Sequence, residues 1–163
     1  MGLAKSRTRI NIGGGYLEVS TDGGSNWDWI GYTESSKIND SIATEEIHDE
    51  NAEFLGLGLG NELVTFETVM LQSTLDELNF WLTYKGKKID ARYQAWMPGT
   101  SKWQLYSLDE VIVDPNLELN FGTSKRTWTF KVYSLKGATN GKYYAIAETA
   151  NNPPEAGDWP DAS

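Results

Sequence analysis

Alternation of apolar and polar residues with a period of two runs through most of this chain and limits its fold more than any other feature. It is clearest in three segments, where the side chains that share one strand face are Val64, Phe66, Thr68 and Met70 in 63–70, Ile89, Ala91, Tyr93 and Ala95 in 88–96, and Trp128, Phe130 and Val132 in 126–134. Successive side chains of a strand point to opposite faces, so this pattern predicts half-buried antiparallel strands. Six other stretches also have the composition of strands: 16–20, 27–32, 103–108, 110–113, 117–121 and 142–148.

One helix is expected to interrupt the strands, over residues 74–85. Thr74 followed by Glu77 is typical of a capping box, and Gly86 suits the left-handed position after the last turn. Lys85 lies in the last turn, where a cation complements the helix dipole. The apolar residues at helical spacing, which predict a stripe packed on the sheet, are Leu75, Leu78, Trp81 and Leu82.

We therefore expect a mainly β fold, an antiparallel β-sandwich or partial barrel with one flanking helix. A length of 163 residues is sufficient for one domain with its own core. The expected divisions are a basic N-terminal arm at 1–9, a β domain at 10–149 and a proline-rich, extended C-terminal tail at 150–163. Within the β domain, 39–62 is expected to be a long irregular loop, because it mixes acidic residues with the run Gly56-Leu57-Gly58-Leu59-Gly60.

The charge of the chain is unevenly distributed. The formal net charge is −9, yet the ten acidic residues between Asp40 and Glu77 are accompanied by no lysine or arginine, so the rest of the chain is nearly neutral. Separated acidic and basic patches favour head-to-tail contact between copies, although two solvated faces without a partner would carry the same pattern. Each leucine in the acidic stretch would contribute about 1.5–3 kcal/mol of stabilising free energy if a contact covered it fully. The candidate contact residues are Glu45, Glu46, Asp49, Glu50, Glu53, Phe54, Leu55, Leu57 and Leu59 on the acidic side, and Lys5, Arg7, Arg9, Lys85, Lys87 and Lys88 on the basic side.

The residue types give little support to catalytic or metal-binding chemistry. There is no cysteine and a single histidine, His48, which excludes thiolate sites and any site that needs two imidazoles. The acidic stretch lacks the glycine and alternating oxygen ligands of a calcium loop, and its glycine-rich run precedes a strand rather than the helix that a phosphate loop requires. We expect no enzyme activity, no metal and no cofactor. No apolar run is long enough to span a membrane, so no membrane partner is expected either.

Tryptophan residues leave one alternative function open. Trp27 and Trp29 are expected on one strand face, and more indole surface comes from Trp96, Trp103 and Trp128. Exposed coplanar rings would form a sugar-stacking platform, so a carbohydrate-binding β-sandwich module is the alternative. If the rings are buried in the core or at a subunit boundary, they serve packing instead.

The segment from Ser20 to Trp27 predicts a tight hairpin turn. Asp22-Gly23-Gly24 supplies residues that adopt turn conformations between two expected strands. The string resembles the Asp-box turn of sialidase-like propellers, with Asn26 in place of a threonine. A propeller needs several such repeats, and this chain has one.

The order of the expected elements resembles that of bacteriophage tail tube proteins. The matching succession is the strand 16–20, the Asp-Gly-Gly turn, Trp27-Asp28-Trp29-Ile30-Gly31, the polar stretch 33–41, the long acidic loop, the strand 63–70, the helix, and antiparallel strands to about residue 149. The resemblance implies a self-assembling structural protein of the virion tail, made in the host cytoplasm, which forms hexameric rings that stack into a tube with other tail proteins as partners. It also implies that the loop at 40–60 reaches the neighbouring ring.

The same resemblance implies that DNA passes through the tube without tight binding. An acidic wall repels phosphate groups, so an electronegative conduit lets DNA slide. Another tail component of the same fold, such as a terminator or baseplate protein, is a further alternative.

Overall fold

The computed structural model describes residues 15–30, 32–71, 75–122, 126–137 and 139–162. The elements in these ranges are β1 (Gly15–Ser20), β2 (Asp28–Trp29), β3 (Tyr32–His48), β4 (Phe54–Leu71), α1 (Leu75–Tyr84), β5 (Lys88–Met97), β6 (Lys102–Val113), β7 (Leu119–Phe121), β8 (Arg126–Ser134), β9 (Ala145–Thr149) and the short 3-10 helix η1 (Ala156–Asp158). The strands form one antiparallel sheet in the order β2-β1-β5-β6-β8-β4-β3, with β7 on β8 and β9 on β6. The predicted mainly β fold with one helix is confirmed.

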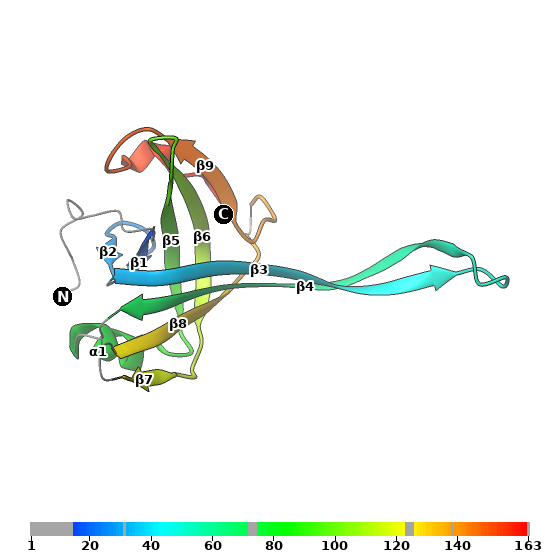
Figure 1. Ribbon diagram of the computed structural model, residues 1–163, viewed down its shortest axis with the longest axis horizontal. Coiled ribbons are helices and arrows are strands. Elements are labelled where there is room, and N and C mark those ends of the chain that lie inside the picture. The colour runs from blue at the N-terminus through cyan, green and yellow to red at the C-terminus, as the bar shows by residue number, and fades with distance from the viewer. Residues whose placement is uncertain (1–14, 31, 72–74, 123–125, 138, 163) are drawn as a thin grey trace.

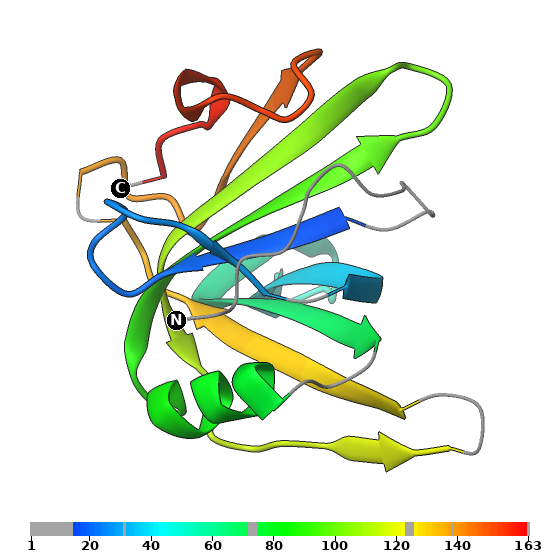
Figure 2. The same cartoon turned by 90° about the vertical axis from the view of Figure 1, so that its left-hand side faces the viewer.

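The sheet curves around its core without closing into a barrel (Figure 2). The three segments with the clearest alternation point their predicted inward residues into this core, and all of these are buried except Ala95, which is half-buried. A second, smaller cluster lies on the other face of β1, β5 and β6, and its buried members are Tyr16, Trp29, Trp103 and Leu105. This part of the sheet is therefore covered on both faces.

Helix α1 begins and ends within one residue of the prediction, but its buried face differs from the predicted stripe. Phe80 and Trp81 are buried, whereas Leu75 and Leu82 are 73% and 54% exposed. The aromatic side chains decide the orientation, because Phe80 packs near Phe130 of the core, with 6.5 Å between ring centroids. The Trp81 indole N–H also donates to the backbone carbonyl of Asp114.

At the C-terminal end of α1, the predicted role of Gly86 is confirmed, whereas Lys85 follows the last turn and does not lie within it. Gly86 has φ +72° and its N–H donates to the carbonyl of Val113 at 2.8 Å, so the left-handed position joins the helix to β6. Thr74, the predicted cap, lies outside the described residues.

The segment after β9 is folded against the body and is not the extended tail that its prolines predicted. Pro154 and Ala162 are buried, and the Asn151 side chain donates to Asp158 at 2.9 Å. The Trp159 ring lies 4.3 Å from the guanidinium carbon of Arg92 on β5. Its indole supplies the apolar area that holds this segment on the second cluster.

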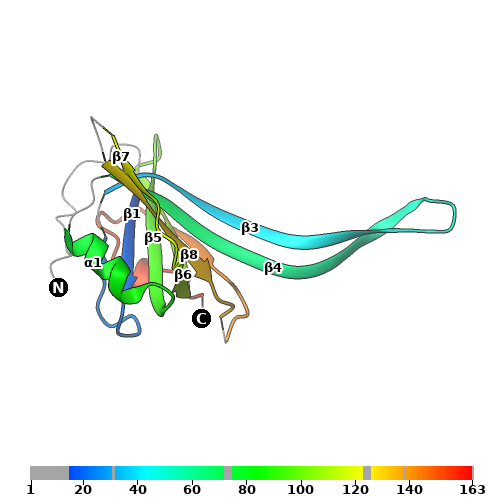
Figure 3. The same ribbon diagram turned by 90° about the horizontal axis from the view of Figure 1, so that it is seen from below.

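The largest difference from the predictions is at 39–62, which forms a β-hairpin instead of an irregular loop. β3 and β4 pair from Tyr32 and Leu71 at the body to His48 and Phe54 at the tip. The polar stretch 33–41 is part of the same strand, which sequence analysis had not recognised. Figures 1 and 3 show the hairpin projecting far from the body. We call residues 39–62 the arm.

The turn between β1 and β2 forms as predicted. The Asp22 carboxylate accepts hydrogen bonds from the backbone N–H of Asn26 at 2.9 Å, from the Asn26 side chain at 2.6 Å and from the Ser20 hydroxyl at 2.7 Å. Gly23 and Gly24 have φ of +74° and +86°, which a residue with a Cβ rarely adopts. The bonds from Asn26 and then Ser20 lower the pKa of Asp22 from its ordinary 3.8 to about 2.

This depressed pKa predicts a defined pH dependence for Asp22→Ala. A carboxylate whose pKa is lower in the folded state stabilises the protein above its unfolded-state pKa and loses that effect as pH falls through the folded-state value. The melting temperature of Asp22→Ala should therefore lie below that of the unchanged chain by a constant amount down to about pH 4. The gap should then narrow between about pH 4 and 2. Thermal unfolding followed by circular dichroism measures this, and a gap that stays constant to pH 2 would contradict it. Thr21→Ala, an exposed neighbour, serves as the control.

Candidate functional site

The arm is an isolated two-stranded ribbon with an apolar surface. Apart from the half-buried Asp49, Gly56, Gly58 and Glu62, its side chains are exposed to solvent. Nine residues of strand, from Asp40 to His48, span about 30 Å, at about 3.3 Å per residue. The large apolar side chains on it and their exposed fractions are Ile42 43%, Ile47 48%, Phe54 60%, Leu55 64%, Leu57 52% and Leu59 72%. So much apolar area on a ribbon without a core of its own is typical of an interaction surface.

The two faces of the arm differ. Leu57 lies opposite Glu46 in the strand register and Leu59 opposite Thr44, so these side chains share one face. Gly58 lies opposite Glu45 on the other face, and the alternation of the strand places Gly56 on that face as well. One face therefore carries leucines beside Glu46 and Thr44, and on the other face glycines lie opposite Glu45 and Ile47.

Asp49 closes the tip of the arm. Its carboxylate accepts hydrogen bonds from the backbone N–H groups of Asn51 and Glu53 at 2.9 and 2.8 Å. The Asp49 N–H also donates to the carbonyl of Glu53 at 3.0 Å, and Ala52 has φ +61°. The connection between the strands is thus only a short turn.

The root of the arm is attached to the body through acidic side chains. The Tyr144 hydroxyl donates to the carboxylate of Asp40 at 3.1 Å. A hydrogen bond to Asp40, burial and the Asp40 charge together raise the pKa of Glu62. This contact lies where the hairpin leaves the sheet.

The structure brings the predicted acidic contact residues together on the arm and places the predicted basic ones elsewhere. Glu45 and Glu46 lie on β3, Asp49, Glu50 and Glu53 in the tip, and Phe54, Leu55, Leu57 and Leu59 on β4. The other described candidates, Lys85, Lys87 and Lys88, follow α1 at the opposite side of the molecule (Figure 1). Lys5, Arg7 and Arg9 lie outside the described residues.

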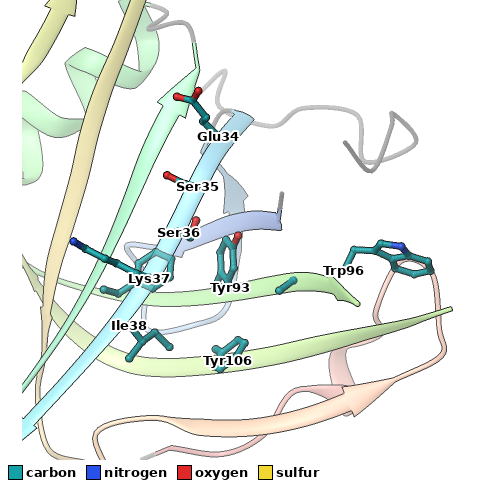
Figure 4. A pocket seen from close by; sticks show the side chains of 10 residues that line it. Glu34, Ser35, Ser36, Lys37, Ile38, Tyr93, Trp96 and Tyr106 are labelled. Atoms are coloured by element: carbon teal, nitrogen blue, oxygen red, sulfur yellow. The ribbon is translucent and has the colours of Figure 1, made fainter. Parts of the chain in front are cut away.

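A pocket of about 540 Å³ lies beside the body end of β3. Figure 4 shows Tyr93 and Tyr106 on the sheet facing the start of β3. Among the described residues that line it, Glu34 is the single carboxylate and Lys37 the single cation, and Lys37 also lies 3.8 Å from Glu67. This lining lacks the two facing carboxylates that hydrolysis of a glycoside requires.

The tryptophans do not form the sugar platform that Trp27 and Trp29 had made an alternative. Trp29 is 2% exposed and packs against Tyr16 with 4.6 Å between ring centroids. The Trp27 ring is half-buried and lies 4.1 Å from the guanidinium carbon of Arg92. The two rings therefore do not present a shared exposed face.

Across the described ranges, no three or more histidine, aspartate or glutamate side chains are placed to hold a metal ion. His48, at the end of β3, lies 3.0 Å from the carboxylate of Glu46. None of the helices that the structure describes has the length and apolar character needed to cross a membrane.

Comparison with solved structures identifies chains of the same fold. A chain from the structure of an extracellular contractile injection system, PVC sheath/tube terminator in extended state, superposes with a TM-score of 0.55 at 11% identity, covering 87% of this chain and 97% of that one. A chain from the PVC sheath-tube complex has a TM-score of 0.52 at 13% identity, covering 88% and 93%. A chain from the anti-feeding prophage baseplate has a TM-score of 0.53 at 6% identity, covering 87% and 96%. This chain shares their fold. No protein-family model and no curated protein matches its sequence.

Sequence analysis missed several apolar members of the exposed surface. Ile42, Ile47 and Leu63 were not named, and Leu75 and Leu82 were assigned to the core. A signal for the arm was present in the alternation of leucine and glycine over 55–60, which has the period of a strand. For α1, spacing gave no such signal, because several apolar residues compete for the buried face.

Proposed function

We propose that this chain is a structural subunit of a phage-like tail tube, and that it has no catalytic activity. Copies would associate into hexameric rings, and the rings would stack into a tube within a virion tail, together with other tail proteins. The observation that carries the proposal is the arm, an exposed ribbon whose leucines and acidic groups have no covering element in the described chain. The shared fold with chains from sheath-tube and baseplate structures supports the same assignment.

The arm exposes apolar side chains that contact with another copy would bury. Each exposed leucine is worth about 1.5–3 kcal/mol on full burial, and a neighbouring copy is the partner that a repeating assembly supplies. The arm projects to one side of the body (Figure 3), and in a stack of rings its partner surface would lie on a different part of the next copy. Such heterologous contacts generate rings when the rotation closes and stacks when it does not.

The charge of the chain suits a conduit. With a formal net charge of −9, a tube of many copies would repel phosphate groups, so DNA would pass through without binding tightly.

A terminator is the second candidate, because a chain from a sheath/tube terminator structure shares this fold over 97% of its length. A terminator ends a tube, so its rings would form and not elongate. The carbohydrate-binding alternative has lost its basis, since Trp29 is buried and Trp27 lies against Arg92.

Size-exclusion chromatography over a concentration series, with negative-stain microscopy of the fractions, tests this function. We expect rings that stack into tubes as the concentration of the full chain rises. Rings that never elongate, even when tubes are added as seeds, would favour the terminator. A monomer at every concentration would contradict both.

A further inference from the structure

Helix α1 presents an apolar face that the body leaves uncovered. Leu75 and Leu82 are 73% and 54% exposed and lie seven residues apart, so they stand on the same side of the helix two turns from each other. Asn79, which lies between them, is also exposed. The buried Phe80 lies on the opposite side of α1, and the buried Trp81 lies on its flank. This face is therefore not part of the core.

Three lysines follow the C-terminal end of α1. Lys85, Lys87 and Lys88 are exposed, and the first two extend over aromatic rings, with Lys85 Nζ 5.4 Å from the centre of the Trp81 ring and Lys87 Nζ 5.9 Å from that of Tyr84. Lys88 lies 3.3 Å from Glu110 in an exposed ion pair. We call Leu75, Leu82, Lys85, Lys87 and Lys88 the helix surface.

The helix surface and the arm are complementary in charge and in apolar character. The arm carries leucines beside glutamates, and the sequence from Asp40 to Glu77 has no cation. The helix surface carries leucines beside lysines. Among the described residues, Asp76 is exposed at its far end and Glu110 pairs with Lys88, which leaves Lys85 and Lys87 as the cations without a carboxylate partner in these ranges. Opposite charges around paired apolar groups set the register of an interface and exclude wrong partners.

The two surfaces lie on opposite sides of the molecule (Figures 1 and 3). The arm therefore points away from the helix of its own chain. We propose that the helix surface receives the arm of a second copy, in a head-to-tail contact that repeats along the assembly. This inference rests on the proposed function and specifies which surface completes the arm.

Disulfide trapping between two variants tests the contact. The chain has no cysteine, so Leu57→Cys and Leu82→Cys each introduce a single thiol. One variant carries a tag that changes its mass, and the two variants are mixed, assembled and oxidised with diamide. If the arm of one copy lies on the helix surface of the next, a disulfide-linked heterodimer should form. A disulfide requires Cα atoms within about 7 Å, so the heterodimer reports direct contact. Leu57→Cys mixed with Ile146→Cys is the matched control, since Ile146 is 52% exposed on β9, away from α1. We expect at least ten times more heterodimer from the first pair than from the control.

Charge reversal provides a second measurement that does not depend on cysteine geometry. Replacement of Lys85, Lys87 and Lys88 by glutamate should abolish assembly, as should replacement of Glu46, Glu50 and Glu53 by lysine. A chain that carries all six changes should assemble again, because the attraction is restored with reversed sign.

The outcomes separate this inference from the proposed function. The helix surface would be overturned as the receptor if the unchanged chain assembles, the 57–82 disulfide does not form, and the variant with all six charge changes does not assemble. The tail-subunit proposal would still stand in that case. An unchanged chain that never assembles would overturn both.

Discussion

Replacement of Leu55, Leu57 and Leu59 by threonine should abolish assembly and leave the body of the protein folded. The three side chains are 52–72% exposed, so a neighbour that covers them recovers about 1 kcal/mol or more from each. A loss of about 3 kcal/mol at each contact raises the concentration needed for assembly by at least about a hundredfold. Threonine keeps the strand propensity of the arm, so the change acts on the contact and not on the hairpin.

The measurement is the assembly threshold by size-exclusion chromatography, with circular dichroism to confirm an unchanged melting temperature. The matched control replaces three exposed apolar residues that lie outside the arm and α1, namely Leu119, Phe121 and Ile146, by threonine. The control should assemble as the unchanged chain does. Equal thresholds for the arm variant and the unchanged chain would show that the arm is not the contact.

Arg92→Met should destabilise the body by about 3–5 kcal/mol, which is the usual cost of breaking a buried ion pair. The Arg92 guanidinium donates to the carboxylate of Glu18 at 2.5 Å, and the two side chains are 12% and 0% exposed. The guanidinium also lies between the rings of Trp27 and Trp159, 4.1 and 4.3 Å from their centres. Burial lowers the pKa of Arg92 to about 10, so the side chain is still charged at neutral pH. Loss of Arg92 leaves the fully buried Glu18 carboxylate without this cation. It also removes the contact of the guanidinium with Trp159 in the C-terminal segment.

Thermal unfolding measures this effect. For a chain of this length each kcal/mol shifts the melting temperature by about 2–4 °C, so we expect a fall on the order of 10 °C. The double variant Glu18→Gln/Arg92→Met should recover part of it, because the pair then leaves no buried charge of its own. Lys88→Met, which breaks the exposed pair with Glu110, should change stability by at most about 1 kcal/mol. A similar loss in Arg92→Met and Lys88→Met would contradict the assigned role of Arg92.

The arm and this buried pair were predictable to different degrees. The clustering of acidic residues and leucines at 45–59 was visible in the sequence, and so was the possibility of a contact surface. Its shape was misjudged, because glycine-rich composition was taken as a sign of irregular structure. The alternation of leucine with glycine has the period of a strand, and the pairing of β3 with β4 satisfies the backbone groups that an irregular loop would leave to water. The pair of Glu18 and Arg92 joins residues 74 positions apart, and no local pattern indicates it.

The sequence by itself determined most strands of the body, the helix and the Asp22 turn, because these depend on side-chain periodicity and on bonds between residues close in the chain; β3 and the arm were not among them. Alternation at 63–70 and 126–134 identified buried side chains before any pairing was known. Only the tertiary structure decided which face of α1 is buried, since Leu75 and Phe80 compete for the core and the larger ring fills the space beside Phe130. It also decided that the C-terminal segment covers the outer sheet face, because Trp159 finds its partner, Arg92, on a distant strand.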